Sequence, residues 1–285
     1  MWLAFEDEDR LRVASRRKSL ERLSLVPGDL VLARQVGAEH VLVERREPRA
    51  FTLERHTVGG RRKTMAANVD GIAIVAALAE PPPHLGMVDE LLAFAEIEEI
   101  GARLVLTKPD LASAEFSDAT AALYRGLGYV VLVVNPKAAQ GIEAFARELA
   151  GRRTLLIGQS GVGKSSLFRA LGGRAEVGDV SKHGRGRQTT SAGRLHRFAE
   201  GFLIDSPGVG EFELHEAGSG LVAAGFREFA ACTARCRFSD CTHRDEPGCA
   251  VRDAVGSGAI AASRYASYRS ILARQGDGTP SVQRV

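Results

Sequence analysis

The sequence predicts a multidomain protein of the α/β class, in which a mainly parallel sheet forms the central domain. Three observations support this prediction. From about residue 66 onward, fully apolar runs alternate with segments of helical periodicity, a pattern typical of parallel strands covered by helices on both faces. Short strand-like segments precede this alternation, and all four cysteines follow it. A chain of 285 residues with 45% hydrophobic side chains can form two or three such domains.

The N-terminal residues 1–65 predict short β-strands. The segments PGDLVLAR at 27–34, EHVLVERR at 39–46 and RAFTLERH at 49–56 start about ten residues apart, which favours a small barrel or sandwich. The preceding segment RLRVASRRKSLERL, residues 10–23, is compatible with a strand, a helix or a loose basic arm.

The central region alternates between the two kinds of regular structure. Apolar strands are predicted at 70–78, 102–107, 129–134 and 152–158, and helices at 84–101, 115–128, 141–151 and 165–171. Residues 174–193 are glycine-rich and basic and predict a mobile loop, and 194–199 and 201–205 predict a paired β-ribbon. After Gly218 the sequence predicts helices interrupted by a cysteine-rich loop.

A glycine-rich turn between the strand TLLI and the helix SSLFRAL predicts a phosphate-binding loop. Its pattern is G-x-x-x-x-G-K-[ST], where glycines let backbone N–H groups turn toward phosphate beside a helix terminus. Lys164 is expected to reach the β- and γ-phosphates, and Ser165 to bind Mg²⁺. The residues of the predicted loop are Gly158, Gln159, Ser160, Gly161, Val162, Gly163, Lys164, Ser165 and Ser166.

The segment Thr107-Lys108-Pro109-Asp110 fits N/T-K-x-D, the motif by which GTPases read guanine. Its Asp accepts from guanine N1–H and N2–H₂, a pair of donors that adenine lacks, and its Lys stem packs along the base. Asp205 and Gly208 fit D-x-x-G, in which the Asp lies near Mg²⁺ and the Gly senses the γ-phosphate. Thr189 and Thr190 lie between the phosphate loop and Asp205. They are candidates for the switch threonine that completes the Mg²⁺ shell.

The order of these motifs is a circular permutation of the usual GTPase order. The guanine reader comes first, then the phosphate loop, the switch threonine and D-x-x-G. Sheet and helices can form the same site from a chain that is cut elsewhere. The second switch then leads directly into the C-terminal region, which predicts an order–disorder switch.

The cysteine pattern predicts a zinc site. Cys236, Cys241, His243 and Cys249 supply three thiolates and an imidazole, a Cys₃His set for tetrahedral Zn²⁺, and a cytosolic protein favours metal over disulfides. The motif includes no carboxylate or open position for catalysis, so the zinc is expected to be structural. A Cys₄ set that uses Cys232 in place of His243 is the alternative; otherwise Cys232 is a small buried apolar residue.

Together the permuted order, GQSGVGKSSL, DSPGV, AANVDGIAIV and the cysteine pattern resemble the ribosome small-subunit-dependent GTPase A family, RsgA or YjeQ. The resemblance covers nearly the whole chain. It implies an N-terminal OB-fold over 1–65, a permuted GTPase domain over 66–216 and a zinc-binding helical domain over 217–285. It also implies a late assembly factor that binds the small ribosomal subunit, hydrolyses GTP there and departs.

The sequence departs from the family pattern at three positions. Thr107 stands where the family usually has Asn, and its shorter reach predicts weaker GTP binding. In the next base-proximal loop, which follows the strand YVVLVV, Asn135-Pro136 stands where the family usually has Ser-Ala. Gln188 replaces the family's switch histidine. Many GTPases place a water-orienting Gln directly after D-x-x-G, but here that position is Val209, which cannot orient water. We therefore expect slow intrinsic turnover, with Gln188 as the water-orienting group.

The charge distribution bears on partners. Residues 1–65 carry 14 Lys and Arg against 10 Asp and Glu, whereas 66–150 carry 5 against 12. Basic ends indicate either rRNA contact, with strong salt dependence, or a solvated surface. Lys182, Arg185 and Arg187 are expected to contact rRNA or to stabilise the transition state.

The expected location is the cytoplasm, and the expected oligomeric state is a monomer. No apolar run approaches the ~20 residues of a membrane span, and the start MWLAFEDEDR does not fit a signal peptide. Two other functions are compatible with the motifs: a slow nucleotide-dependent RNA clamp, and a P-loop ATPase or kinase, which Asp110 disfavours.

Overall fold

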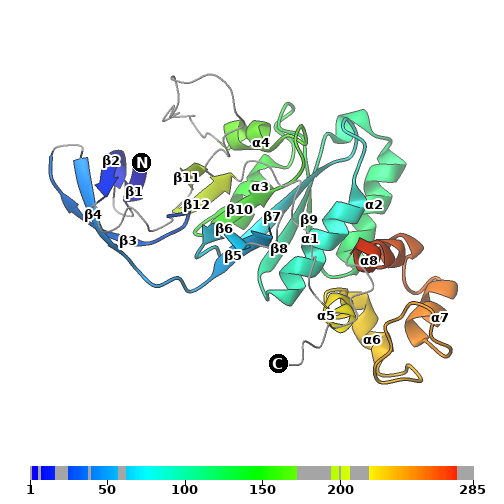
Figure 1. Ribbon diagram of the computed structural model, residues 1–285. Helices are drawn as coiled ribbons and strands as arrows, with labels where there is room; N and C mark the ends of the chain where they lie inside the picture. The colour runs from blue at the N-terminus through cyan, green and yellow to red at the C-terminus, as the bar shows by residue number, and fades with distance from the viewer. Residues whose placement is uncertain are drawn as a thin grey trace, which may run out of the picture.

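The computed structural model has a β-rich N-terminal part, a central sheet with helices and a C-terminal group of helices (Figure 1). It describes residues 2–5, 8–16, 25–37, 40–56, 62–171, 194–198, 200–205 and 218–274. Within those ranges, no helix is long and apolar enough to span a membrane.

The N-terminal strands form two sheets. Strands β1 (Trp2–Phe5), β2 (Glu8–Arg16), β4 (His40–Arg46) and β3 (Val31–Gln35) lie in this order in the first sheet, where β2 and β4 are parallel. Strands β5 (Thr52–His56) and β6 (Arg62–Ala67) form a separate antiparallel pair. The three predicted strands are therefore confirmed, and residues 10–16 form a strand. The described residues do not confirm a closed barrel, so the OB-fold stays a prediction.

A buried junction connects the N-terminal sheets to the central domain. Leu53 of β5 and Ala66 of β6 are fully buried in the same apolar cluster as the central sheet. Asn68, which follows β6, donates from Nδ2 to the Gly28 carbonyl at 3.0 Å and accepts from the Ala50 N–H at 2.9 Å. The β5–β6 pair thus shares its core with the domain that follows it.

The central sheet has six strands in the order β11-β12-β10-β7-β8-β9. Five of them run parallel: β7 (Gly71–Ala77), β8 (Gly101–Thr107), β9 (Val130–Val134), β10 (Arg153–Ile157) and β12 (Gly201–Asp205). Strand β11 (Arg194–Phe198) pairs antiparallel with β12, as the predicted ribbon requires. The sequence prediction of a mainly parallel sheet is confirmed.

Helices cover both faces of this sheet, which explains why its strands are fully apolar. Successive strand residues point to opposite faces. Ile72 and Ile74 pack with α1 (Leu85–Ile97) and α2 (Ala114–Gly126). Ala73 and Val75 pack in a second cluster with α3 (Ile142–Leu149) and α4 (Lys164–Ala170).

The C-terminal helices form a smaller core of their own. They are α5 (Ser219–Ala224), α6 (Ala230–Thr233), α7 (Ala250–Gly256) and α8 (Ala262–Arg274), with a 3-10 turn at Arg227–Phe229. Phe226 and Phe229 stack at its centre, and both meet the Tyr268 ring edge to face, with ring centroids 5.0 to 5.5 Å apart. Ala93 of α1 joins this core, so the C-terminal helices pack directly on the central domain.

Arg264 of α8 forms a fully buried polar contact between the two regions. Its side chain is 1% exposed and lies 2.7 Å from Asp89 of α1 and 2.7 Å from Glu228. The Tyr124 hydroxyl of α2 donates to the same Asp89 oxygen at 2.7 Å, and the guanidinium lies 4.5 Å from the Phe226 ring centroid. Each charge therefore has a partner within the contact.

Removing the Arg264 side chain should destabilise the protein strongly. In Arg264→Ala, Asp89 and Glu228 are left buried without their cation, which typically costs about 3–5 kcal/mol. Urea denaturation followed by circular dichroism measures this loss in the free energy of unfolding.

The matched control is Arg147→Ala, because the pair that Arg147 makes with Glu143 at 4.0 Å is exposed to solvent. Such pairs contribute about 0–1 kcal/mol. If Arg264→Ala were no less stable than this control, the assigned importance of the contact would be wrong.

Candidate functional site

The predicted nucleotide-binding segments meet at one edge of the central sheet. Thr107 is the last residue of β8 and pairs with Ala77 and Val134, the last residues of β7 and β9. The phosphate loop follows Ile157 at the end of β10. Ligands of open α/β sheets bind at the carboxyl ends of the strands, so this edge is the expected position for a nucleotide.

The phosphate loop has the backbone conformation that its glycines allow. Gly161 and Gly163 have φ values of +80° and +100°, where other residues are strained. A Cβ on Gly158 would lie 2.2 Å from the Val75 carbonyl oxygen. The Lys164 ammonium donates to the carbonyls of Gly158 and Gln159 at 2.6 and 2.8 Å. The start of the loop is therefore bound to the lysine at its end.

Thr107 joins the predicted guanine loop to the phosphate loop. Its side chain is buried, and its hydroxyl donates to the Val162 carbonyl at 2.6 Å. A second carbonyl, that of Ala76 in β7, lies 3.3 Å away. Thr107, which replaces the family's longer Asn, therefore has a direct partner in the phosphate loop.

The rest of the guanine loop is held from both sides. Lys108 has a left-handed backbone with φ of +56° and donates from Nζ to the Glu80 carbonyl. Asp110 lies in a 3-10 turn with its side chain exposed, and its Oδ1 accepts from Asn135 Nδ2 at 2.9 Å. The resemblance placed Asn135 in the next base-proximal loop but left its contribution open, and the structure brings its side chain to Asp110.

The structure does not test the switch residues. Gln188, Thr189, Thr190 and Gly208 lie outside the described residues, as does the predicted loop 174–193. The backbone of Asp205 ends β12 and pairs with Leu156 of β10, which places it beside the phosphate loop, but its side chain is not described. Ser165 is exposed at the start of α4, so only part of the predicted Mg²⁺ shell can be located.

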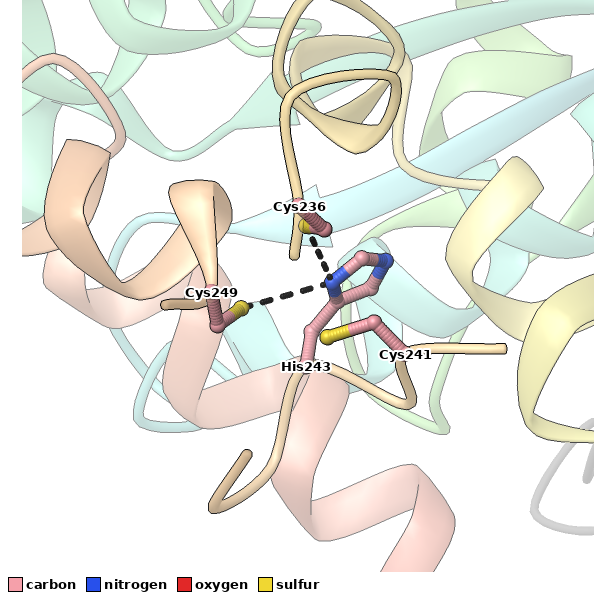
Figure 2. Close-up of side chains that lie close together, drawn as sticks. All are labelled: Cys236, Cys241, His243 and Cys249. Carbon is pink, nitrogen blue, oxygen red and sulfur yellow. Dashed lines mark hydrogen bonds between the residues drawn. The ribbon is translucent and has the colours of Figure 1, made fainter. Parts of the chain in front are cut away.

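The predicted zinc ligands converge in the C-terminal region (Figure 2). The ligand atoms of Cys236, Cys241, His243 and Cys249 all lie within 4.8 Å of one another. His243 Nδ1 is 3.6 Å from the Cys236 sulfur and 3.5 Å from the Cys249 sulfur. Cys232, although buried nearby, is not part of this group of converging ligand atoms, so the structure favours Cys₃His over the Cys₄ alternative.

The donor chemistry fits Zn²⁺. All of these cysteines are free thiols, and three sulfurs with one imidazole form a set typical of tetrahedral zinc. Burial lowers the pKa of His243, which favours the neutral imidazole that binds metals. Burial also raises the pKa of the Cys241 thiol to about 12, a shift that a bound dication would reverse.

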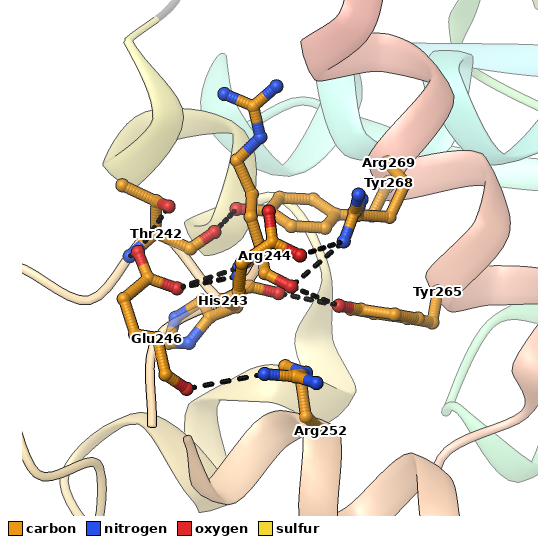
Figure 3. A network of polar contacts seen from close by, with 9 residues as sticks. Thr242, His243, Arg244, Glu246, Arg252, Tyr265, Tyr268 and Arg269 are labelled. Atoms are coloured by element: carbon orange, nitrogen blue, oxygen red, sulfur yellow. Dashed lines mark hydrogen bonds and ion pairs between the residues drawn. The ribbon is translucent and has the colours of Figure 1, made fainter. Parts of the chain in front are cut away.

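The four predicted ligands lie on residues 236–249, here called the zinc loop. Side chains outside the ligand set hold this loop in shape (Figure 3). Glu246 accepts from the Thr242 N–H at 2.8 Å and from the Arg244 N–H at 2.9 Å. Although burial alone raises the pKa of Glu246, hydrogen bonds from Thr242 and from backbone amides lower it to about 2. From α8, Tyr265 and Tyr268 donate to the carbonyls of His243 and Thr242 at 2.7 and 2.6 Å.

Glu246→Gln should therefore release zinc faster. Both carboxylate oxygens accept hydrogen bonds, and an amide replaces one oxygen with a donor that faces other donors. Loss of such support typically weakens metal binding about 10–100-fold. Transfer of zinc to a chromogenic chelator measures the effect.

Asp245→Asn is the control, because the neighbouring Asp245 side chain is 82% exposed. If both variants released zinc at the parent's rate, Glu246 would have no such supporting role.

Comparison with known proteins places this arrangement in one family. The model of the RsgA GTPase family matches residues 46–215. A Chromohalobacter salexigens protein named small ribosomal subunit biogenesis GTPase RsgA is 43% identical over 262 residues, which cover 90% of this chain and 76% of that protein.

Solved structures show the same fold. YjeQ from Thermotoga maritima has a TM-score of 0.72 and 28% identity, covering 94% of this chain and 91% of its own. YloQ, described as a circularly permuted GTPase, has a TM-score of 0.71 and 24% identity, covering 96% and 89%. The permuted order predicted from the motifs is thereby confirmed.

Proposed function

The chain belongs to the RsgA GTPase family and is a GTP hydrolase, and from this premise we propose that it acts on the small ribosomal subunit. It binds the subunit late in maturation, hydrolyses GTP there and leaves after hydrolysis. A similar protein carries the name small ribosomal subunit biogenesis GTPase, which supports this role. A ribosomal partner also implies a cytoplasmic location.

The observation that carries the nucleotide-binding part of this proposal is the contact between the guanine and phosphate loops at Thr107. It supports a single nucleotide site in which Asp110 and Lys108 read guanine while Gly158 to Ser166 hold the phosphates. The selectivity for guanine follows from Asp110, because an adenine would leave this acceptor without its two donors.

Within this site we assign roles to three groups: the cation that stabilises phosphate charge, the residues that bind Mg²⁺ and the residue that orients the attacking water. Lys164 places its ammonium at the mouth of the phosphate loop, where it can stabilise negative charge on the transferred phosphoryl group. Ser165, with Thr190 or Thr189, is the proposed Mg²⁺ shell, and the ion when bound neutralises phosphate charge. Gln188 is proposed to orient the attacking water, because Val209 follows D-x-x-G where other GTPases use Gln.

The remaining parts of the chain are proposed to serve binding. Residues 1–65 form an OB-fold that contacts rRNA through backbone charge, 66–216 form the GTPase domain and 217–285 form the zinc domain. The zinc is structural, since four protein ligands close a tetrahedron. The protein is proposed to act as a monomer.

Release of phosphate from GTP, with and without purified small ribosomal subunits, tests the function. We expect the subunit to raise GTP turnover by about tenfold or more, because partner contacts complete slow GTPase sites. ATP should not be hydrolysed faster with the subunit. Lys164→Ala should lose the stimulated rate.

Tight GTP-dependent binding without stimulation would instead favour a slow RNA clamp. Stimulated hydrolysis of ATP would favour a P-loop ATPase and would contradict the assigned role of Asp110.

Gln188→Ala tests the hydrolytic role separately. We expect the subunit-stimulated rate to fall about 100-fold, in the range that a positioned catalytic group contributes. GTP affinity should stay close to that of the parent, since the side chain acts on water. An unchanged stimulated rate would remove Gln188 from the mechanism.

A further inference from the structure

Helix α8 contacts the zinc loop through two tyrosines (Figure 3). The Tyr265 hydroxyl donates to the His243 carbonyl at 2.7 Å, and the Tyr268 hydroxyl donates to the Thr242 carbonyl at 2.6 Å. Tyr268 also shares an apolar cluster with Cys249, another predicted zinc ligand. The positions of these carbonyls depend on the fold of the zinc loop, so the fold of that loop determines where α8 finds its hydrogen-bond acceptors.

The same helix is paired with α1 at both of its ends. Arg264, in the first turn of α8, lies 2.7 Å from Asp89, and Arg274, its last residue, lies 2.5 Å from Glu90. Both acids are buried in α1. Because a buried carboxylate that loses its cation is strongly destabilising, these pairs oppose any shift of α8 relative to α1.

A third contact brings α8 to the start of α1. Gly86 lies in the first turn of α1, and a Cβ on this residue would lie 3.8 Å from the Ser267 Oγ of α8. His84 caps the same turn, because its Nδ1 accepts from the Met87 N–H at 3.0 Å. Helix α8 therefore lies against the turn with which α1 begins.

The segment that precedes this turn borders the nucleotide edge. Residues 78–84 connect the end of β7 to α1. Within this connection the Glu80 carbonyl accepts from Lys108 Nζ of the guanine loop. Pro81 lies beside the phosphate loop, since a Cβ on Gly161 would be 3.7 Å from its Cδ. A displacement of α1 at its start is thus passed to both loops of the nucleotide site.

We propose that α8 couples the zinc loop to the nucleotide site, so that bound zinc and bound guanine nucleotide strengthen each other's binding. The proposal rests on the proposed function, in which the Cys₃His cluster holds zinc and the sheet edge holds the nucleotide. Packed side chains and ion pairs on rigid elements are what carries coupling between distant sites. Without zinc, the loop carbonyls lose their fixed positions, α8 loses its anchor, and its contacts with α1 weaken.

Competition for zinc at equilibrium, on the full-length zinc-loaded protein, tests this coupling. A zinc-selective chelator is titrated with and without saturating GDP, and the zinc that remains on the protein gives its affinity. GDP should raise the zinc affinity about fivefold or more, which is the lower end of typical coupling between two sites. ADP at the same concentration is the control, because it has the same diphosphate, which binds free zinc, but a different base.

The reverse effect must have the same size, because coupling between two binding equilibria is reciprocal. In calorimetric titrations, GDP should bind the zinc-stripped protein more weakly than the zinc-loaded protein, by the factor found in the competition. The competition starts from the zinc-loaded protein, so it decides the proposal even if the stripped protein does not stay folded.

Variants of α8 test the connection itself. Tyr268→Phe keeps the ring in the aromatic core and removes the hydrogen bond to the zinc loop, whereas Arg274→Ala removes the pair with Glu90. Each should lower the coupling factor about two- to threefold, as expected for the loss of one polar contact. Ser270→Ala is the matched control, because Ser270 is exposed on the same helix, and it should keep the parent's factor.

The outcomes separate the coupling from the proposed function. Equal zinc affinity with and without GDP, in a protein that binds both ligands, would overturn the proposal and leave the proposed function intact. A full coupling factor in both Tyr268→Phe and Arg274→Ala would exclude α8 as the connection. If the zinc-loaded parent bound no GDP, the proposed nucleotide site would itself be wrong, and the coupling with it.

Discussion

The two loops of the nucleotide site are connected across the sheet by a hydrogen bond from the buried Thr107 hydroxyl to the Val162 carbonyl. Strands β8 and β10, which carry the two loops, are not neighbours; β7 lies between them. Thr107 crosses the end of β7 to reach the phosphate loop, with the Ala76 carbonyl also close by. The contact depends on the order of strands in the sheet and not on their order along the chain, which is why a permuted chain can form the site.

A second constraint joins the zinc loop to the central domain through helix α8. Tyr265 and Tyr268 of this helix hold carbonyls of the zinc loop, and Arg264, on the preceding turn, pairs with Asp89 of α1. Helix α1 in turn packs on β7 and β8, whose ends form the nucleotide edge. The C-terminal helices are therefore packed against the domain that binds nucleotide, and a displacement of α8 must disturb either the zinc loop or the charges on α1.

Sequence patterns predicted the parts of the molecule in which one physical rule dominates. Strands buried on both faces must be apolar, so the central sheet was predictable, and metal geometry restricts cysteine spacing, so the zinc ligands were too. Arg264 was not predictable, because an arginine on a helix is usually solvated and its buried acids come from distant elements. Residues 10–23 were not assignable either, because this mostly basic segment is compatible with a strand, a helix or a loose arm, and only the pairing of β2 with β1 and β4 shows residues 10–16 to be a strand.

The guanine loop shows why side-chain roles were harder to predict than motifs. A four-residue motif cannot fix its own geometry, and each functional residue of this one is held by a different strand end. Thr107 contacts the loop after β10, Lys108 the loop after β7 and Asp110 the loop after β9. The residues of the motif provide the functional groups, whereas contacts with the neighbouring loops set the orientation of those groups. The orientation of the guanine loop is consequently a property of the sheet edge as a whole.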